Sequence, residues 1–232
     1  MKKGIVKIYS EVAGTYEIVN HILTFGLDRV WRRKAAGMAV SAGGALWLDV
    51  CSGTGEMAEN LICRAPEKTR VTALDGSLPM LAAAGRKSSL SQAVFCVSDV
   101  GRLPFPSCSF DLITISFATR NINPNRHELT AYLKEFCRVL KPGGLFINLE
   151  TSQPRNHLLK SFFHFYVRCA VKPVGILFSG SQAGYSYLAY TLPRFYPAPE
   201  LSTLIEKAGF DHVAFRRLFL GVAAIHTGIK PL

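Results

Sequence analysis

Hydrophobic positions along the chain fall into short continuous runs that alternate with longer segments of helical spacing. The short runs lie near 45–51, 70–75, 93–98, 110–116 and 144–150, and they are typical of buried parallel strands. The segments with helical spacing lie near 55–64, 78–87, 126–140 and 199–208. This alternation predicts an α/β fold with a doubly wound, mostly parallel sheet.

The two ends of the chain add helices before this predicted sheet and two more strands after it. Residues 1–34 have helical character and end in a basic cluster, and Ser41–Gly44 break the chain before the first strand. Two further strands, near 212–219 and 222–228, follow the last helix and predict an antiparallel C-terminal strand. We therefore expect a single domain over residues 1–232, in which residues 1–40 form a helical cap.

The segment 151–198 differs in composition from the rest of the chain. It holds no acidic residue, is rich in aromatic side chains and carries five lysines and arginines. Residues 155–171 predict a helix with one apolar and one basic face. As an insertion after the fifth strand, this segment can cover an apolar substrate and touch an anionic bilayer. The alternative is an ordinary core helix followed by a loop.

A glycine-containing loop directly follows the first predicted strand. Asp49 lies near the end of that strand, and Ser52, Gly53, Thr54 and Gly55 lead into the next helix. Glycines allow a sharp turn and leave no Cβ between the main chain and a ligand. Open α/β sheets bind ligands at this end of their strands. The loop therefore predicts a cofactor site.

Acidic residues around the loop select the kind of cofactor. Glu56 opens the helix after the loop, where it would repel a pyrophosphate. A ligand with an amine and a sulfonium fits the pair Asp49 and Glu56 better. Asp75 ends the second strand, at the position that binds ribose hydroxyls in such folds. Together these residues predict S-adenosylmethionine; the alternative is a structural glycine turn with a solvated Asp75.

Composition and charge limit the kinds of partner, metal site and cellular location that we expect. The formal net charge of +11 and pI near 9.6 favour an anionic partner such as nucleic acid, acidic lipid headgroups or a polyanionic substrate. The six cysteines form no C-x-x-C pair, so we expect no metal site. We find no secretory signal and no uncharged apolar run of about 18 residues, as a membrane-spanning helix requires. We therefore expect a cytoplasmic protein.

Several motifs together resemble a known family over nearly the whole chain. They lie at 16–20, 24–33, 48–58, 75–81, 103–106, 109–117, 120–122, 138–144 and 185–188. With these stretches the chain is similar to the quinone-biosynthesis C-methyltransferases of the UbiE/MenG type. The Gly-Leu-Asp-Arg-x-Trp-Arg-Arg motif at 26–33 and the Ser-Phe-x-x-Arg-Asn motif at 116–121 are the most specific.

This resemblance implies a class I, Rossmann-like methyltransferase that uses S-adenosylmethionine to methylate a ring carbon of a prenylated quinol, in menaquinone or ubiquinone biosynthesis. It implies cofactor contacts at Thr54, Asp75, the pair Asp99 and Val100, and Ser116. The complete cofactor-binding set that we expect is Asp49, Ser52, Gly53, Thr54, Gly55, Asp75, Gly76, Met80, Asp99, Val100 and Ser116. The resemblance also implies a transient association with the inner face of a membrane, with residues 1–40 and 151–198 facing the substrate; a homodimer stays open.

The chain departs from the family pattern at four places. Glu17 follows Tyr16 where an aspartate is usual, and Ala118-Thr119 replace Gly-Leu before Arg120. Val100 replaces alanine after Asp99. The segment 190–192 reads Tyr-Thr-Leu where the family usually has an acidic residue followed by Ser-Ile. These departures concern the acceptor more than the cofactor.

Carbon methylation of a hydroquinone requires an electron-rich ring, close in-line approach, a dry pocket and a base for the ring proton. We expect Arg120 to stabilise a phenolate or to orient a water that acts as the base. Asn121 can hold the second ring oxygen, and Tyr16 and Asp99 are further candidates. Among the histidines His164 is best placed as a base, although a packed histidine is the simpler interpretation.

Three other functions compete with this one. An RNA methyltransferase would suit the basic charge, but the segment 116–119 lacks the amide-binding loop of such enzymes, and we expect no nucleic acid partner. A non-catalytic binding protein would not need the intact glycine loop. A methyltransferase that acts on another apolar aromatic molecule fits the departures near the C-terminus.

Overall fold

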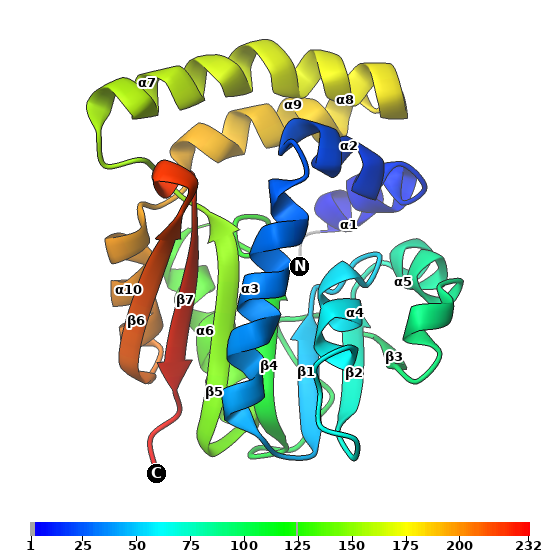
Figure 1. The fold of residues 1–232 in the computed structure, drawn as a ribbon, viewed down its shortest axis with the longest axis vertical. Helices are drawn as coiled ribbons and strands as arrows, with labels where there is room; N and C mark the ends of the chain where they lie inside the picture. The colour runs from blue at the N-terminus through cyan, green and yellow to red at the C-terminus, as the bar shows by residue number, and fades with distance from the viewer. Residues whose placement is uncertain (1–2, 124) are drawn as a thin grey trace.

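The computed structural model describes residues 3–123 and 125–232, and a seven-stranded sheet forms the centre of this described part (Figure 1). The strands are β1 (Leu46–Val50), β2 (Arg70–Asp75), β3 (Val94–Val97), β4 (Phe110–Ser116), β5 (Leu140–Thr151), β6 (Asp211–Leu218) and β7 (Ala223–Ile229). Their order in the sheet is β3-β2-β1-β4-β5-β7-β6. Strands β1 to β5 are parallel, and β7 is antiparallel to both of its neighbours. The predicted fold class is confirmed.

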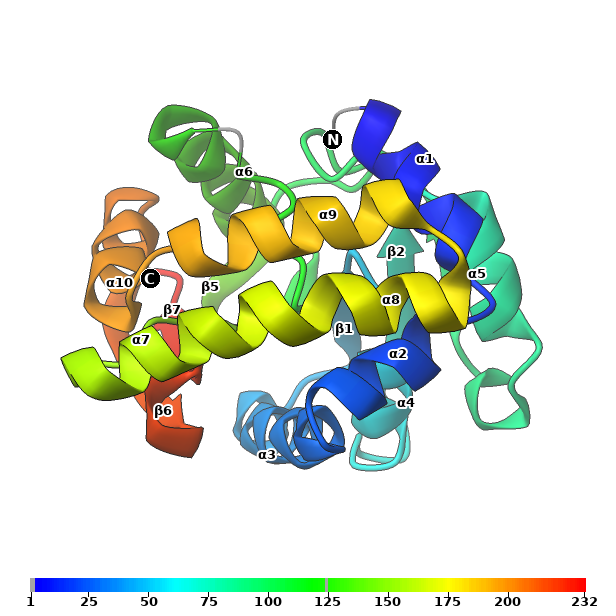
Figure 2. The same ribbon diagram turned by 90° about the horizontal axis from the view of Figure 1, so that it is seen from above.

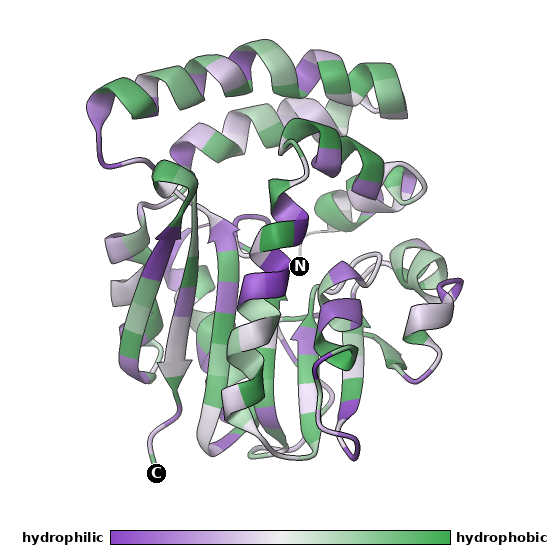
Figure 3. Cartoon of the chain, viewed as in Figure 1, coloured by the Kyte–Doolittle hydropathy of each residue, from purple (hydrophilic) through white to green (hydrophobic). Residues whose placement is uncertain are grey.

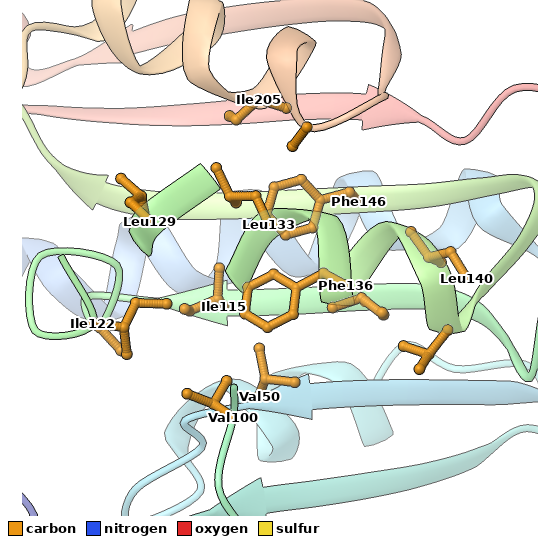
Figure 4. Packing of buried hydrophobic residues seen from close by; sticks show 14 of the residues in the cluster. Val50, Val100, Ile115, Ile122, Leu129, Leu133, Phe136, Leu140, Phe146 and Ile205 are labelled. Atoms are coloured by element: carbon orange, nitrogen blue, oxygen red, sulfur yellow. The ribbon is translucent and has the colours of Figure 1, made fainter. Parts of the chain in front are cut away.

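Helices cover both faces of the sheet. They are α3 (Leu27–Ala39), α4 (Glu56–Ile62) and α5 (Leu78–Gly85) on one face, and α6 (Arg126–Val139) and α10 (Ala198–Lys207) on the other. Successive strand residues point to opposite faces, so Trp47 packs with α3 and α4 while Leu48 joins the core beneath α6. Figure 4 shows this second core, where Phe136 of α6 and Phe146 of β5 lie with ring centroids 6.0 Å apart.

The fifth strand begins earlier than the sequence predicted. Helix α6 ends at Val139, just before the Lys-Pro-Gly-Gly sequence at 141–144, and β5 already starts at Leu140. Gly143 N–H donates to Lys230 O, and Lys230 N–H donates to Gly144 O. The turn is therefore held by the C-terminal end of the chain and becomes part of the strand.

Further helices lie above the carboxyl ends of the parallel strands (Figures 1 and 2). They are α1 (Lys3–Val12), α2 (Tyr16–Leu23), α7 (His157–Tyr166), a π-helical segment (Val167–Val171), α8 (Lys172–Ser179) and α9 (Gln182–Thr191). We call these helices the cap. It includes α1 and α2 of the segment 1–40, whereas α3 of that segment packs on the sheet. The cap has its own small core, in which Val19, Val167 and Tyr185 are buried.

Segments α7 and α8 and the π-helical turn between them form one long rod, which Figure 2 shows beside α9. The helix predicted over 155–171 begins at His157, where Asn156 caps it, and continues to Ser179. Hydrophobic colouring dominates this rod in Figure 3. Among the described residues we find no helix that is both long enough and apolar enough to cross a membrane.

Candidate active site

The loop between β1 and α4 turns through three residues in the left-handed region of backbone space. Cys51, Gly53 and Gly55 have φ of 54°, 57° and 84°. A Cβ on Gly55 would lie 2.4 Å from Leu90 Cδ1, so only glycine fits there. A Cβ on Gly53 would meet no atom of a described residue within 4 Å. The loop therefore presents bare main chain on its open side.

Beside this loop lies a small cleft of about 50 Å³, which we call the loop cleft. The loop after β1, the ends of β2 and β4, helices α3, α4 and α5, and the cap all contribute to its lining. The lining residues are Tyr9, Tyr16, Arg32, Cys51, Ser52, Gly53, Thr54, Glu56, Met57, Asp75, Met80, Ser116, Phe117, Ala118 and Asn121. Of the predicted cofactor residues, Ser52, Gly53, Thr54, Asp75, Met80 and Ser116 are in this set. Asp49, Gly55, Gly76, Asp99 and Val100 do not line the cleft.

Asp49 supports the loop from behind. Its carboxylate is fully buried and accepts hydrogen bonds from Ser52 Oγ and Thr114 Oγ1, both at 2.6 Å. Burial raises the pKa of Asp49 to about 6, although both hydroxyl donors act against this shift. The sequence predicted that Asp49 and Glu56 together face the ligand. In the structure only Glu56 faces the cleft, whereas Asp49 supports the loop.

Asp75 connects the end of β2 to the glycine loop. Its Oδ2 accepts Gly53 N–H at 2.9 Å, and its Oδ1 accepts Ser77 N–H at 2.8 Å. Burial raises the pKa of Asp75, while these backbone donors lower it. Each carboxylate oxygen has a second lone pair. Asp75 can thus accept further hydrogen bonds from a ligand in the cleft.

The residues after β3 lie farther from the loop cleft. Val100 packs in the core beneath α6 (Figure 4). Asp99 is exposed, and its Oδ1 accepts Gly101 N–H at 2.9 Å. The adenine contact expected at this pair stays a prediction.

A buried network of charges ties α3 to the start of α4, directly after the glycine loop. Arg32 Nη1 lies 2.6 Å from Asp28 Oδ2, and Arg32 Nη2 lies 3.0 Å from Glu56 Oε2. Burial raises the pKa of Glu56, and the Arg32 charge lowers it. The guanidinium also stacks 5.0 Å from the centroid of the Phe117 ring. The specific motif at 26–33 therefore places a cation of the chain in the wall of the loop cleft.

Three side chains near this network have the spacing of a metal site. Glu17, His21 and Glu56 offer ligand atoms within 4.8 Å of one another. Glu17 pairs with Lys87, and Glu56 pairs with Arg32. The carboxylate charges are thus already neutralised by lysine and arginine.

Arg120 follows β4 and is deeply buried. Its Nη1 donates to Glu150 Oε1 and Thr151 Oγ1, both at 3.1 Å, and its Nε donates to Thr191 Oγ1 at 3.2 Å. The main-chain N–H of Arg120 donates to Glu150 Oε2 at 3.0 Å. Burial opposes the charge of Arg120, but Glu150 raises its pKa. Glu150 thus fixes both main chain and side chain of Arg120, and Nη2 takes no part in these bonds.

Asn121 is the neighbour of Arg120 on the side of the loop cleft. Its side chain is buried, and Asn121 Oδ1 has no hydrogen-bond partner among the described residues. A buried acceptor without a partner is costly. Asn121 is therefore a polar group that a ligand can satisfy.

A second, larger cavity of about 390 Å³ lies between the cap and the sheet. We call it the apolar cavity, because aliphatic and aromatic side chains of α1, α2, α7, α9 and the π-helical segment form most of its wall. Arg120 and Thr151 are among its few polar residues.

The loop cleft and the apolar cavity share part of their walls. Tyr9, Tyr16, Arg32 and Phe117 line both. The rings of Tyr9 and Tyr16 meet edge to face, with centroids 5.7 Å apart. Burial raises the pKa of both phenols, so they are neutral donors at physiological pH. These four residues, the shared wall, lie where a cofactor in the cleft would meet an acceptor in the cavity.

Sequence reasoning did not select Tyr9, Arg32 or Glu150 as site residues. Arg32 could have been found, because it stands four residues after Asp28 within the specific motif at 26–33. Tyr9 and Glu150 gave no local signal. His164, the expected base, donates a hydrogen bond from Nε2 to Gln153 Oε1 at 2.8 Å and is not among the residues that line the cavity.

Comparisons with known proteins extend over the full chain. Residues 1–230 match the ubiE/COQ5 methyltransferase family. The chain is 36% identical to the demethylmenaquinone methyltransferase of Lactiplantibacillus plantarum over 227 residues, which cover 96% of this chain and 94% of the relative. It is 36% identical to the ubiquinone/menaquinone biosynthesis C-methyltransferase UbiE of Dinoroseobacter shibae over 235 residues, 99% of this chain and 92% of that protein.

Solved structures confirm the fold. A chain in the complex between the Haloferax volcanii Trm112 methyltransferase activator and a putative methyltransferase aligns with a TM-score of 0.63 at 18% identity, covering 95% of this chain and 98% of that one. A SAM-dependent methyltransferase of Aquifex aeolicus aligns with a TM-score of 0.55 at 19% identity, with 81% and 82% coverage.

The family, the enzyme class and the fold expected from the motifs are confirmed by these matches. With a full-length family match and relatives above 30% identity on nearly the whole chain, this protein belongs to the ubiE/COQ5 methyltransferase family.

Proposed function

We propose that this chain transfers a methyl group from S-adenosylmethionine to a ring carbon of a prenylated quinol, as in menaquinone or ubiquinone biosynthesis. The observation that carries the proposal is the shared wall, which joins a polar cleft at the glycine loop to an apolar cavity of about 390 Å³. The names of the full-length relatives support the same reaction.

The residues of the loop cleft fit this cofactor. Asp75 would accept hydrogen bonds from the ribose, and the bare main chain at Gly53 allows close approach. Glu56 and the unsatisfied Asn121 Oδ1 offer acceptors for the amino group. When bound, S-adenosylmethionine supplies an electrophilic methyl group on a positively charged sulfur, and S-adenosylhomocysteine remains.

The apolar cavity suits the acceptor. Its wall of aliphatic and aromatic groups would hold a prenyl tail, and Arg120 lies among its few polar side chains. A guanidinium in a dry pocket favours the ionised form of a nearby phenol. We propose that Arg120 stabilises the quinol as phenolate, which makes the ring carbon nucleophilic.

The remaining steps concern protons. As the new carbon–carbon bond forms, the ring carbon must lose its proton to restore aromaticity. Arginine stays protonated in proteins, so we propose that Arg120 orients a water that takes this proton. Tyr16 and Asn121 would donate hydrogen bonds to the ring oxygens.

The test uses isotopically labelled S-adenosylmethionine with reduced demethylmenaquinone in liposomes, followed by mass spectrometry of the lipid. A product with one labelled methyl on a ring carbon is expected. If calorimetry shows cofactor binding but no quinol is methylated, the acceptor assignment is wrong.

A second candidate is the same reaction on another prenylated aromatic ring. Tyr190 stands where the family pattern usually has an acidic residue, and Oγ1 of the next residue, Thr191, accepts a hydrogen bond from Arg120 Nε. Tyr190 is neutral where the family usually has a negative charge, directly next to this partner of Arg120. Competition between demethylmenaquinol and a prenylated benzoquinol in one reaction mixture would separate the candidates.

We also propose that the chain works while associated with the surface of a membrane, because its acceptor would reside there. The basic, acid-free segment 151–198 supports this location.

A further inference from the structure

The apolar cavity reaches the surface between three segments of the chain. They are the turn between α2 and α3, helix α7, and the 3₁₀ turn η5 (Phe219–Gly221) that joins β6 to β7. Phe25, Phe162, Phe219 and Leu220 line the cavity and yet are 80%, 70%, 57% and 65% exposed. These four residues, which we call the rim, form the mouth of the cavity.

The backbone at the rim is strained. Phe25, Phe219 and Leu220 have φ of 53°, 39° and 58°, a region that bulky side chains avoid. Val222, the residue after η5, is tied to the end of β5, because Ser152 N–H donates to Val222 O at 2.7 Å. Strain of this kind persists where the surroundings impose it and clusters at functional sites. Here it presents large apolar groups to the outside.

Helix α7 continues the apolar surface outward from the rim. Leu158, Phe162 and Phe165 are spaced by four and three residues, so they lie on one face of the helix. Leu158 and Phe165 are 81% and 63% exposed and do not line the cavity. The rim and these two residues together form what we call the docking face.

The charge around the docking face has one sign. Arg29, Arg155, Arg168 and Arg217 are exposed and lie within three residues of its three segments along the chain. Within 24–29, 155–168 and 215–222 the sequence has one carboxylate, Asp28. Asp28 is buried and paired with Arg32. A surface with apolar groups at its centre and cations around them complements a bilayer with anionic headgroups.

We propose that the docking face inserts into an anionic bilayer, and that the acceptor enters the apolar cavity from the lipid through the rim. Because Arg120 is buried and the rim is exposed, the ring must enter first and the tail trails into the bilayer. Docking itself stands on the surface described above, whereas the passage of a prenyl tail rests on the proposed function.

Vesicle binding tests docking without any reaction. The probe is binding of the full chain, with no cofactor or acceptor, to vesicles of equal parts phosphatidylglycerol and phosphatidylcholine. Leu158→Ser/Phe165→Ser should lower the partition coefficient about tenfold or more, since each change removes a large apolar side chain from the docking face. The control is Val40→Ser/Phe95→Ser, which removes one aliphatic and one aromatic side chain, 48% and 38% exposed, away from the docking face and should change binding less than about twofold.

Equal binding by both double variants, or an equal loss in both, would overturn the docking proposal. Vesicles of phosphatidylcholine alone should bind the wild type at least about tenfold more weakly. Equal binding to neutral and anionic vesicles would overturn the role of the cations. Melting temperatures of both variants show whether each is folded.

A turnover assay separates this inference from the proposed function. With a short-tailed, water-soluble quinol, Leu158→Ser/Phe165→Ser should keep wild-type kcat/KM, because neither residue touches the cavity. With a long-tailed quinol in vesicles, its kcat/KM should fall about tenfold. Equal values for the long-tailed quinol would overturn lipid entry through the rim. A wild type that methylates neither quinol but binds vesicles through the docking face would overturn the proposed function and leave docking supported.

Discussion

Arg120 is held by Glu150 so firmly that its position is set before any ligand arrives. The ion pair is buried, and the two partners also share a bond from the Arg120 main chain. Burying two charges is costly, and the pair compensates this cost only while both members are present. Arg120 therefore contributes both to the stability of the fold and to the proposed chemistry. Stability and turnover must be measured separately to distinguish the two roles.

Arg120→Ala should lower kcat by about 10²–10³-fold, as expected when a charge stabiliser is removed, and leave the Kd for S-adenosylmethionine within about threefold. It should also cost about 3–5 kcal/mol in the free energy of unfolding, because Glu150 is left unpaired. Single-turnover kinetics, calorimetry and denaturation would check each value.

The control for this variant is Arg126→Ala, which removes an arginine from an exposed pair with Glu200. It should change stability by less than about 1 kcal/mol. Wild-type turnover in Arg120→Ala would remove Arg120 from the mechanism, whereas loss of turnover in both variants would point to an effect on folding.

Asp49 gives the protein a pH-dependent stability that one substitution should remove. Its pKa lies at about 6 instead of the ordinary 3.8, so the folded state binds a proton more tightly than the unfolded state. Stability from this group is therefore present at low pH and lost as the pH rises through about 6. At roughly 1.4 kcal/mol per pKa unit the loss is about 3 kcal/mol.

In Asp49→Asn the side chain at position 49 has no titratable group. The difference in unfolding free energy, wild type minus Asp49→Asn, should fall between pH 4 and pH 7, by about 3 kcal/mol, and stay level above that range. Urea denaturation of both proteins across this range measures the difference. A rise with pH would mean that the Ser52 and Thr114 donors stabilise the charged form of Asp49 beyond the cost of its burial.

At the scale of elements, the cap depends on one close helix contact. Gly175 on α8 is buried, and a Cβ there would lie 1.9 Å from Cγ of the Tyr185 ring on α9. Gly175→Ala should therefore push the two helices apart, at a cost of about 1–3 kcal/mol for overpacking, and raise KM for the acceptor. Gly37→Ala is the control, because a Cβ on Gly37 of α3 meets no described atom within 4 Å.

Gly37→Ala should be neutral or stabilise the protein by up to about 1 kcal/mol. Thermal unfolding and quinol kinetics of both variants test the contact. If Gly175→Ala behaves like Gly37→Ala, the two helices do not pack closely enough to shape the cavity.

Elements with a clear hydrophobic periodicity could be predicted from the sequence. The rod formed by α7 and α8 is an element whose length could not. Strand β4 was predicted at its observed bounds, because an apolar run stands there between polar residues. The end of the predicted helix at Val171 was wrong. Pro173 normally breaks a helix, but the π-helical turn at Val167–Val171 changes the backbone just before it, and the helix continues.

The site was less predictable than the fold. Residues around the loop follow one strand, so spacing alone placed Ser52, Gly53 and Thr54 correctly beside the cleft. The shared wall brings Tyr9 and Arg32 against Phe117, from parts of the chain about 85 to 110 residues apart. Local sequence patterns do not indicate which residues so far apart along the chain come together in space. They also gave no sign that Asp49 would turn away from the cleft.

At the scale of the whole molecule, ligand binding should stabilise the fold. S-adenosylmethionine at about 100 times its Kd adds about 2.7 kcal/mol, which corresponds to a rise in Tm of roughly 5–10 °C for a chain of this size. Asp75→Ala should fold but show no such rise, because its ribose contact is lost. Scanning calorimetry with and without cofactor measures both. An equal shift in Asp75→Ala would contradict the ribose assignment.

The shared wall has a thermodynamic consequence. Tyr9, Tyr16, Arg32 and Phe117 belong to two compartments at once, so an occupant of one that moves these side chains alters the other. The affinities for cofactor and acceptor are then linked, and linkage is reciprocal. If a bound quinol raises the affinity for the cofactor by some factor, the bound cofactor must raise the affinity for the quinol by the same factor. The methylated product and S-adenosylhomocysteine would likewise govern each other's release.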